Sequence, residues 1–473
     1  MKLIRPQLFC RSLPFVLRWA PVFRGRPKSP GGPEPWRHRP RHRLRGRPPG
    51  NRPHSDRAST PAGLDRIQKV LKDCRLSADS PSPPGKRSIM TRRILTTALL
   101  LGALLAPGST AAAAGEAAAP VVTGAVFNNP RGTTAQKNAV KNHIIGAINA
   151  TQSGRTIRAA LYALTDQDYA DALIAAHKRG VQVRVVLDSA YADRPAAQSL
   201  RAALGSDTSG GSWVRVCTTG RACIADAPAE VNPINHNKFF TFSRIGAPGE
   251  AEDVVIQTSA NQTSLNVEKY WNNAYTVVGN TELYSAYVSY FNDLAAMRKN
   301  GDYFRQGKVG TAKYYFFPQA TGDLVVDVLN NVTCTGNTSV GSASHKTVIR
   351  VSAFALHRDA VARKLRALAD QNCWVEVVYA NSNDVGIMQG HPRLKLYRLN
   401  TADGYLVHSK YLIIEGNYAG HRDTKWTFTG SHNLDHSSLR ENDEALLRLE
   451  GAAPHDAYKQ NFLDMRAAAT PVG

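Results

Sequence analysis

One succession of apolar and polar positions occurs twice along the chain. In its first occurrence an apolar run precedes a segment with helical periodicity, which ends at Gly180 before a second apolar run. The pattern predicts a strand, an amphipathic helix stopped by the glycine, and another strand. The predicted ranges are a strand at Ile157 to Ala163, a helix from about Asp168 to Arg179, and a strand at Val181 to Leu187.

The same succession returns in the C-terminal half of the chain. It predicts a strand at Val348 to Ala355, a helix from about Asp359 to Asp370, and a strand at Trp374 to Tyr379. In both copies the connections are short enough for a crossover between parallel strands. A repeat of this kind predicts two similar α/β units within one chain.

Two short polar motifs follow each unit. His-x-Lys opens an apolar strand, and Ser-x-Asn closes the next strand. The histidine and the asparagine are 25 positions apart in both copies, a spacing that two independent domains would not be expected to share by chance. The residues are His236, Lys238, Ser259 and Asn261 in the first copy, and His408, Lys410, Ser431 and Asn433 in the second.

The His-x-Lys spacing places both cationic side chains on one face of a strand, because residues i and i+2 point to the same side. A single His-x-Lys is more often a solvated strand end than a site. Two copies, each before an apolar strand and at a matched distance from Ser-x-Asn, favour a polar pocket instead.

The charge of the chain is unevenly distributed. The full sequence has 59 Lys and Arg against 37 Asp and Glu, a formal net charge of +22. Residues 1–89 hold 21 of the basic and 5 of the acidic residues in a Pro-, Arg- and Gly-rich stretch, for which we expect disorder. We interpret this leader either as the result of a start codon assigned too far upstream or as a dispensable extension. A basic arm for nucleic acid is the alternative.

A secretory signal peptide is predicted at residues 90–114. Arg92 and Arg93 precede an apolar run up to about Ala106, and small residues then form an A-x-A pattern near Ala114. The run is shorter than the roughly 20 residues that span a bilayer, and we expect no transmembrane segment in the mature chain. That mature part keeps 36 basic and 32 acidic residues, a charge of about +4.

The exported part contains four cysteines, Cys217, Cys223, Cys334 and Cys373. An even number outside the cytosol favours disulfides over a metal site. Pairing nearest neighbours keeps each bridge within one half of the chain, and the sequence leaves the other two pairings open.

The doubled motif resembles that of the phospholipase D superfamily, in which His-x-Lys is followed after four residues by Asp and later by Gly-Ser-x-Asn. The resemblance runs from about residue 120 to the C-terminus. It implies an α/β fold of two similar α-β-α sandwich domains, with mixed, largely parallel sheets related by a pseudo-two-fold axis. We expect these domains at residues 120–310 and 311–473, with one composite active site where the two His-x-Lys strands meet.

The chain departs from the family motif in two ways. Ser243 and Glu415 stand where the motif has its Asp. Thr258 replaces the glycine of the first Gly-Ser-x-Asn, whereas Gly430 keeps it in the second. The motif's Asp would lie beyond the reacting groups along the strand, and we interpret its loss as a change in scaffolding.

The implied site suits cleavage of a phosphodiester. Cationic and amide donors would hold the charged non-bridging oxygens, namely Lys238, Lys410, Asn261 and Asn433. One histidine must be neutral to attack phosphorus, and the other must be protonated to release the alcohol. By resemblance to secreted phospholipases D, His236 is the nucleophile and His408 the general acid and then base. The pseudo-symmetry leaves the reverse assignment open. We expect no metal and no other cofactor, since the lysines supply the positive charge.

In the family a carboxylate orients each histidine from a segment shortly after the asparagine. Glu444 is the matching acid in the second copy, whereas Asn272, Asn273 and Ala274 stand there in the first. We therefore expect unequal histidines and a bell-shaped pH dependence. Ser259, Ser431 and Asn272 are predicted to contact the substrate.

These observations predict a secreted, monomeric phospholipase D that cleaves or transfers the headgroup of a phosphatidyl lipid at a membrane surface. A phosphodiesterase or nuclease of the same superfamily and a non-catalytic phosphate- or lipid-binding module stay as alternatives. The near-neutral exported part argues against nucleic acid, and the missing Asp and carboxylate favour the binding module. Tyr270, Trp271 and Tyr405 lie near the motifs and face either a lipid headgroup or the core.

Overall fold

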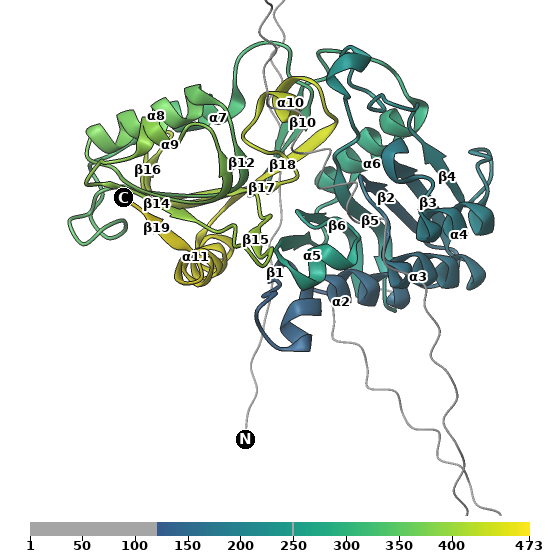
Figure 1. Cartoon of the computed structure of the whole chain (residues 1–473). Helices are drawn as coiled ribbons and strands as arrows, with labels where there is room; N and C mark the ends of the chain where they lie inside the picture. Colours follow the sequence, from purple (N-terminus) through teal and green to yellow (C-terminus); the bar gives the residue numbers. More distant parts are fainter. Residues whose placement is uncertain (1–120, 248–249) are drawn as a thin grey trace, which may run out of the picture. The chain divides into compact units, whose positions relative to one another are not determined.

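The computed structural model of the chain describes residues 121–247 and 250–473. The predicted leader at 1–89 and signal peptide at 90–114 lie outside these residues. The described part contains two large sheets, one built mainly from each repeated half (Figure 1). Within these ranges, none of the helices combines the length and the apolar character needed to cross a bilayer.

The first sheet has seven strands in the order β1-β8-β6-β5-β2-β3-β4. In that order they span Gly124–Phe127, Asn273–Val277, Ala251–Thr258, Lys238–Ile245, Thr156–Leu161, Gln182–Leu187 and Trp213–Val216. The helices of this half are α2 (Thr134–Ala150), α3 (Gln167–Lys178), α4 (Pro195–Leu204), α5 (Ser264–Glu268) and α6 (Thr281–Ala296).

The second sheet follows the order β19-β14-β13-β12-β16-β17-β18-β10-β9, and β11 (Val332–Thr333) pairs with β16. In that order the strands span Thr470–Val472, Leu394–Arg398, Trp374–Ser382, Val348–Leu356, Tyr411–Tyr418, His421–Gly430, Glu444–Glu450, Ala312–Phe317 and Arg305–Val309. The helices are α7 (Leu324–Asn330), α8 (Asp359–Asp370), α9 (Val385–Met388), α10 (His436–Arg440) and α11 (Ala452–Ala467). Strand β9 thus joins the second sheet although it precedes the boundary expected at residue 310.

Both predicted strand-helix-strand units are confirmed. Strands β2 and β3 are parallel, with Thr156 opposite Gln182, and α3 connects them. Strands β12 and β13 are parallel, with Val348 opposite Trp374, and α8 connects them. Hydrophobic periodicity found these elements because each is regular over its whole length.

The sheets are mixed, as predicted, but parallel pairs are a minority, so the expectation of largely parallel sheets is corrected. In the first sheet β5 is antiparallel to β2 and β6, and β8 is antiparallel to β6 and β1. One cause is the short connection between the two motif strands. In the second half only Ala419 and Gly420 join β16 to β17, and both have positive φ, as a two-residue hairpin requires.

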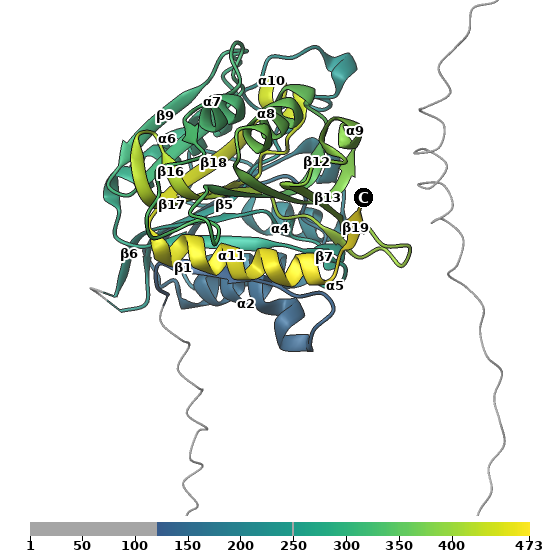
Figure 2. The same ribbon diagram turned by 90° about the vertical axis from the view of Figure 1, so that its left-hand side faces the viewer.

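A continuous core fixes the two halves against each other. Helices α2, α3 and α4 cover the outer face of the first sheet, and α7 and α8 cover that of the second. Between the sheets lie α6 and α11, the latter drawn as the long yellow helix in Figure 2. Tyr290 of α6 stacks on Phe316 of β10 with ring centroids 4.2 Å apart, which joins one half directly to the other.

Two disulfides join Cys217 to Cys223 and Cys334 to Cys373. This confirms the nearest-neighbour pairing, and each bridge closes a loop within its own half of the chain.

Candidate active site

Each His-x-Lys segment is held by the other half of the chain. Strand β15 (Leu406–Val407) lies parallel to β7 (Tyr270–Trp271), and the His408 amide donates to the Trp271 carbonyl at 2.9 Å. In the same way Asn235 pairs with Asp443, and the His236 amide donates to the Asp443 carbonyl at 3.0 Å. Neither histidine can therefore take its position without both halves.

Both histidines line one cavity of about 620 Å³ together with Asn261. Its walls also contain four aromatic side chains, Tyr162, Tyr191, Tyr270 and Phe354. The two motif histidines, which are far apart in sequence, thus line a single open cavity. A volume of this size is typical of a site for a small molecule or for part of a larger one.

Glu444 orients His236 from behind. Its Oε1 lies 2.7 Å from Nδ1 of His236, and its Oε2 accepts a hydrogen bond from the Ser431 hydroxyl. Burial opposes ionisation of this carboxyl, but His236 and Lys238 outweigh burial and hold its pKa at about 2. An ionised carboxylate can only accept, so Nδ1 of His236 carries the proton and Nε2 keeps its lone pair.

Asn272 occupies the corresponding place behind His408. Its Oδ1 lies 2.9 Å from Nδ1 of His408 and accepts from the Ser259 hydroxyl at 3.1 Å. Its Nδ2 donates to the carbonyls of Asn266 and Tyr270, both at 3.1 Å, which fixes the orientation of the amide. Since Oδ1 accepts, Nδ1 of His408 is again the protonated nitrogen.

The two histidines are electrostatically unequal. Burial lowers the pKa of His236, and Glu444 opposes this shift. Burial lowers the pKa of His408 well below its usual value, and the cations Lys410 and Lys238 lower it further. The difference arises because an amide fixes a tautomer without stabilising the imidazolium cation.

The two lysines are buried beside the histidines of their own motifs. Lys238 Nζ donates to the His236 carbonyl at 2.6 Å and lies 5.2 Å from the centre of the Tyr162 ring. Lys410 Nζ donates to the His408 carbonyl at 2.5 Å. Burial lowers the pKa of Lys238 to about 7 and that of Lys410 well below its usual value. A bound anion would favour the charged form of both.

The other predicted residues lie close by but differ in exposure. Ser259 and Ser431 are fully buried and hydrogen-bonded to the side chains behind the histidines. Asn433 is half-buried and lines a smaller cavity with Lys410, not the cavity that contains Asn261. Trp271 is buried in the core between the sheets, whereas Tyr270 lines the shared cavity.

The two departures from the family motif lie in strands behind the cavity. Ser243 accepts a hydrogen bond from the Thr156 amide, and Glu415 pairs with Lys459 at 2.8 Å. The glycine kept in the second copy is sterically required, because a Cβ at Gly430 would lie 2.1 Å from the Ala445 carbonyl oxygen.

The aromatic walls escaped the sequence analysis, although a signal was present. Tyr162 directly follows β2 and Phe354 lies near the end of β12, and both are followed by Ala-Leu. They lie against the histidines of their own halves, with centroid distances of 5.2 Å for Tyr162 and His236 and 5.0 Å for Phe354 and His408. A repeated aromatic position next to a repeated polar motif indicates a shared site.

Comparison with known proteins agrees with this arrangement. The sequence matches the family described as "Cardiolipin synthase, PLD-like domain" over residues 144–295 and 339–466, which include both motif pairs. No curated protein matches the chain significantly. The structure is similar to phosphatidylserine synthase from Haemophilus influenzae Rd KW20, with 14% identity, a TM-score of 0.50, and coverage of 75% of this chain and 89% of that one.

Two further solved structures are similar at lower TM-scores. Polyphosphate kinase from Porphyromonas gingivalis shares 13% identity at a TM-score of 0.46, covering 72% of this chain and 49% of that one, so the chain spans about half of that protein. The phospholipase D family member Nuc from Salmonella typhimurium shares 21% identity at a TM-score of 0.26, covering 37% of this chain and 93% of that one. Structural likeness at such identities concerns the fold alone.

Proposed function

The chain belongs to the phospholipase D superfamily, and from this premise we propose that it is a secreted phospholipase D acting through a phosphohistidine. The observation that carries the proposal is the shared cavity. Two imidazoles from different halves line it, and both have Nδ1 engaged behind the ring, which leaves both Nε2 atoms for chemistry.

In the first step Nε2 of His236 attacks phosphorus and the bond from phosphorus to the headgroup oxygen breaks. The proton of His408 Nε2 passes to the departing oxygen, which leaves as an alcohol. Positive charge develops on the His236 ring as the N–P bond forms, and the ionised Glu444 at 2.7 Å stabilises it. The reverse assignment of the two histidines would leave the nucleophile without this carboxylate.

In the second step His408 accepts a proton from water, and the water oxygen attacks phosphorus. The N–P bond breaks and His236 is regenerated. An alcohol in place of water gives transfer of the phosphatidyl group. Throughout, Asn261 would hold a non-bridging oxygen in the shared cavity, and Lys238 and Lys410 would stabilise the negative charge from beside their histidines. Lys410 and Asn433 line the smaller cavity, so Asn433 would need to turn towards the substrate to contact it. The negative substrate would also raise the pKa of His408 towards the protonated form that the first step needs.

Ser259, Ser431 and Asn272 take positioning roles in this proposal, in place of the substrate contacts expected from sequence. Both serine hydroxyls are completely buried, and each donates to the group that orients a histidine. These residues would therefore affect the substrate only by orienting the two histidine rings.

The lining of the cavity supports a lipid over a nucleic acid. Apart from the motif residues it is largely aromatic and aliphatic, and Arg194 is its one Arg or Lys among the described residues. Nucleic-acid sites neutralise successive phosphates with clustered Lys and Arg, whereas a single phosphodiester is served by the two motif lysines. The two disulfides support export to an oxidising compartment.

The direct test is incubation of the purified protein with phosphatidylcholine vesicles and, separately, with plasmid DNA. Released choline with intact plasmid is the expected result, and His236→Asn should abolish the release. Cut plasmid with intact lipid would favour the nuclease. No product from either substrate would favour the binding module, which the amide at position 272 in place of a carboxylate would then explain.

A further inference from the structure

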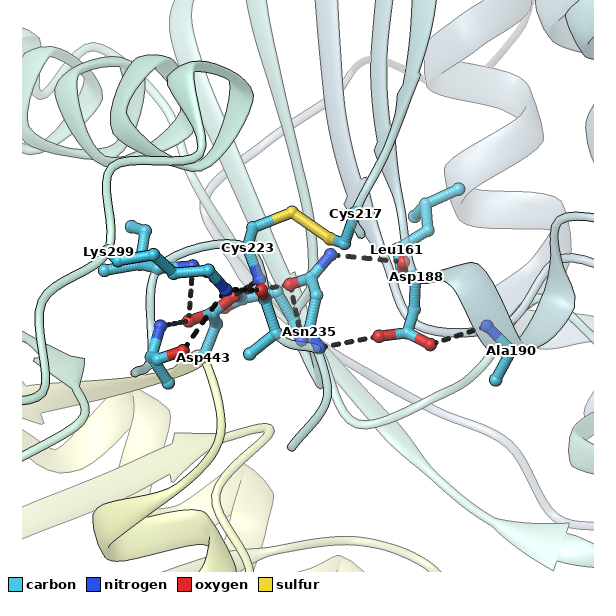
Figure 3. The surroundings of a disulfide bond; sticks show 12 residues. Leu161, Asp188, Ala190, Cys217, Cys223, Asn235, Lys299 and Asp443 are labelled. Atoms are coloured by element: carbon cyan, nitrogen blue, oxygen red, sulfur yellow. Dashed lines mark hydrogen bonds between the residues drawn. A yellow bond between two sulfur atoms is a disulfide. The ribbon is translucent and has the colours of Figure 1, made fainter. Parts of the chain in front are cut away.

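A buried carboxylate outside the reacting groups binds a loop of the first half. Both oxygens of Asp443 accept hydrogen bonds from three successive backbone amides, those of Cys223, Ile224 and Ala225, at 2.7–3.1 Å. Figure 3 shows this carboxylate beside Cys223 and Lys299. Burial raises the pKa of Asp443 to about 7, and the three amides oppose the shift. The charge of Asp443 is thus stabilised by the loop that it binds.

The backbone of the same residue holds the His236 segment. The Asp443 carbonyl accepts from the His236 amide, and the Asp443 amide donates to the Ile234 carbonyl, both at 3.0 Å. The next residue is Glu444, whose carboxylate accepts a hydrogen bond from Nδ1 of His236. A shift of residue 443 would therefore move the histidine and its orienting group together.

The loop is closed by the disulfide between Cys217 and Cys223 at the end of strand β4. The bridge fixes Cys223, whose amide makes one of the two shortest contacts with Asp443, at 2.7 Å. Asn300 N also donates to the Ile224 carbonyl at 2.9 Å, so the loop is held by the segment after α6 as well. The amides of Cys223, Ile224 and Ala225 can donate to one carboxylate only while the loop keeps this backbone conformation.

Among the residues at 121–247 and 250–473, the second half of the site shows no such arrangement. The residue that pairs with the segment before His408 is Trp271, at the place that Asp443 has before His236. Its indole is buried in the core and carries no negative charge. The carboxylate and its disulfide loop therefore act on His236 alone.

We propose that Asp443 is a positioning residue for His236, and that the Cys217–Cys223 disulfide influences the reaction by holding the loop that Asp443 binds. The proposal rests on the proposed function. A small displacement of His236 is sufficient for an effect on rate, because misplacing a reacting group by about 1 Å can cost about a hundredfold.

The test compares Asp443→Asn and the pair Cys217→Ser with Cys223→Ser against a matched control, the pair Cys334→Ser with Cys373→Ser. The control opens the other disulfide, which has no contact with the site. The first two variants should lower kcat by about tenfold to a hundredfold with KM changed less than about twofold, since substrate contacts remain. The control should keep kcat at a temperature where all variants are folded.

A second readout does not depend on turnover. The proton on Nδ1 of His236 gives a downfield NMR signal in its hydrogen bond to Glu444, identified by its loss in His236→Asn. This signal should shift in the Asp443 and Cys217/Cys223 variants and stay unchanged in the control. If wild type cleaves no lipid, the proposed function fails while the signal still tests the positioning role.

An unchanged signal and unchanged kcat in a folded Asp443→Asn protein would overturn the inference. So would an equal loss in the control pair, because that would indicate general destabilisation. If Asp443→Asn does not fold, the comparison of the two cysteine pairs decides alone.

Discussion

Glu444, in the second half of the chain, accepts a hydrogen bond from Nδ1 of His236, in the first, over 2.7 Å. Asn272 of the first half stands in the same relation to His408 of the second, over 2.9 Å. Each histidine is therefore oriented by the half to which it does not belong. Both halves of the chain therefore supply the groups that orient the histidines as well as the histidines themselves.

Replacing Glu444 with Gln should lower kcat by about a hundredfold or more and leave KM nearly unchanged. The amide removes the negative charge that stabilises the His236 ring. Its NH2 group also cannot accept the hydrogen bond that the Ser431 hydroxyl donates to Glu444. Steady-state kinetics measure both constants. Glu441→Gln is the matched control, since Glu441 lies three residues away and forms an ion pair with His436. Wild-type kcat in folded Glu444→Gln would remove the carboxylate from the mechanism.

Replacing Asn272 with Asp should move the alkaline limb of the kcat profile to higher pH by about one unit or more. A carboxylate beside His408 stabilises the imidazolium, and the general acid stays protonated to higher pH. Stability should fall, because the new oxygen faces the carbonyls of Asn266 and Tyr270. The exposed Asn149→Asp variant controls for added charge. A limb that stays in place would show that His408 is not the acid.

Sulfate should inhibit more weakly as the pH rises from about 6 to about 8. The ammonium of Lys238, whose pKa burial lowers to about 7, is lost over this interval. The inhibition constant should rise by about tenfold, which corresponds to one charge-assisted hydrogen bond. Sulfate is a suitable probe because its own charge is constant over the range. Lys238→Met should bind it weakly at both pH values, and a pH-independent constant in wild type would contradict the lowered pKa.

Opening the Cys334–Cys373 bridge should cost more stability than opening Cys217–Cys223. The bridges close sequence separations of 39 and 6 residues, and loop-closure entropy predicts losses of about 4 and about 2 kcal/mol in the free energy of unfolding. Denaturant unfolding of the two serine pairs measures both. The larger stability loss should thus come from the bridge without a catalytic role, and the reverse order would contradict the entropic account.

Local patterns in the sequence predicted the local parts of the fold and of the site. The strand-helix-strand units follow from periodicity, and the matched spacing of His236 to Asn261 and of His408 to Asn433 identified both motif pairs. Likewise, nearest-neighbour pairing gave both disulfides.

The interactions that sequence analysis missed connect distant segments. Nothing in the sequence near Glu444 indicates that it orients His236 and not His408, which is closer in sequence, since that depends on how Asn235 pairs with Asp443 across the halves. Asp443 was missed for the same reason, because its three amide partners lie more than 200 residues away. Hairpins such as the one at Ala419 and Gly420 contribute to the antiparallel majority in the sheets, and strand-helix-strand periodicity does not indicate them.

The central claim is that one histidine of a shared pair attacks phosphorus. Rapid acid-free quenching during turnover of phosphatidylcholine labelled with ³²P, followed by peptide mapping, measures it most directly. We expect a labelled phosphohistidine at position 236. It should accumulate further in His408→Asn when the headgroup is p-nitrophenol, because this group departs without a proton from His408 while water is no longer activated. Label at position 408, or none on the protein in either form, would contradict it.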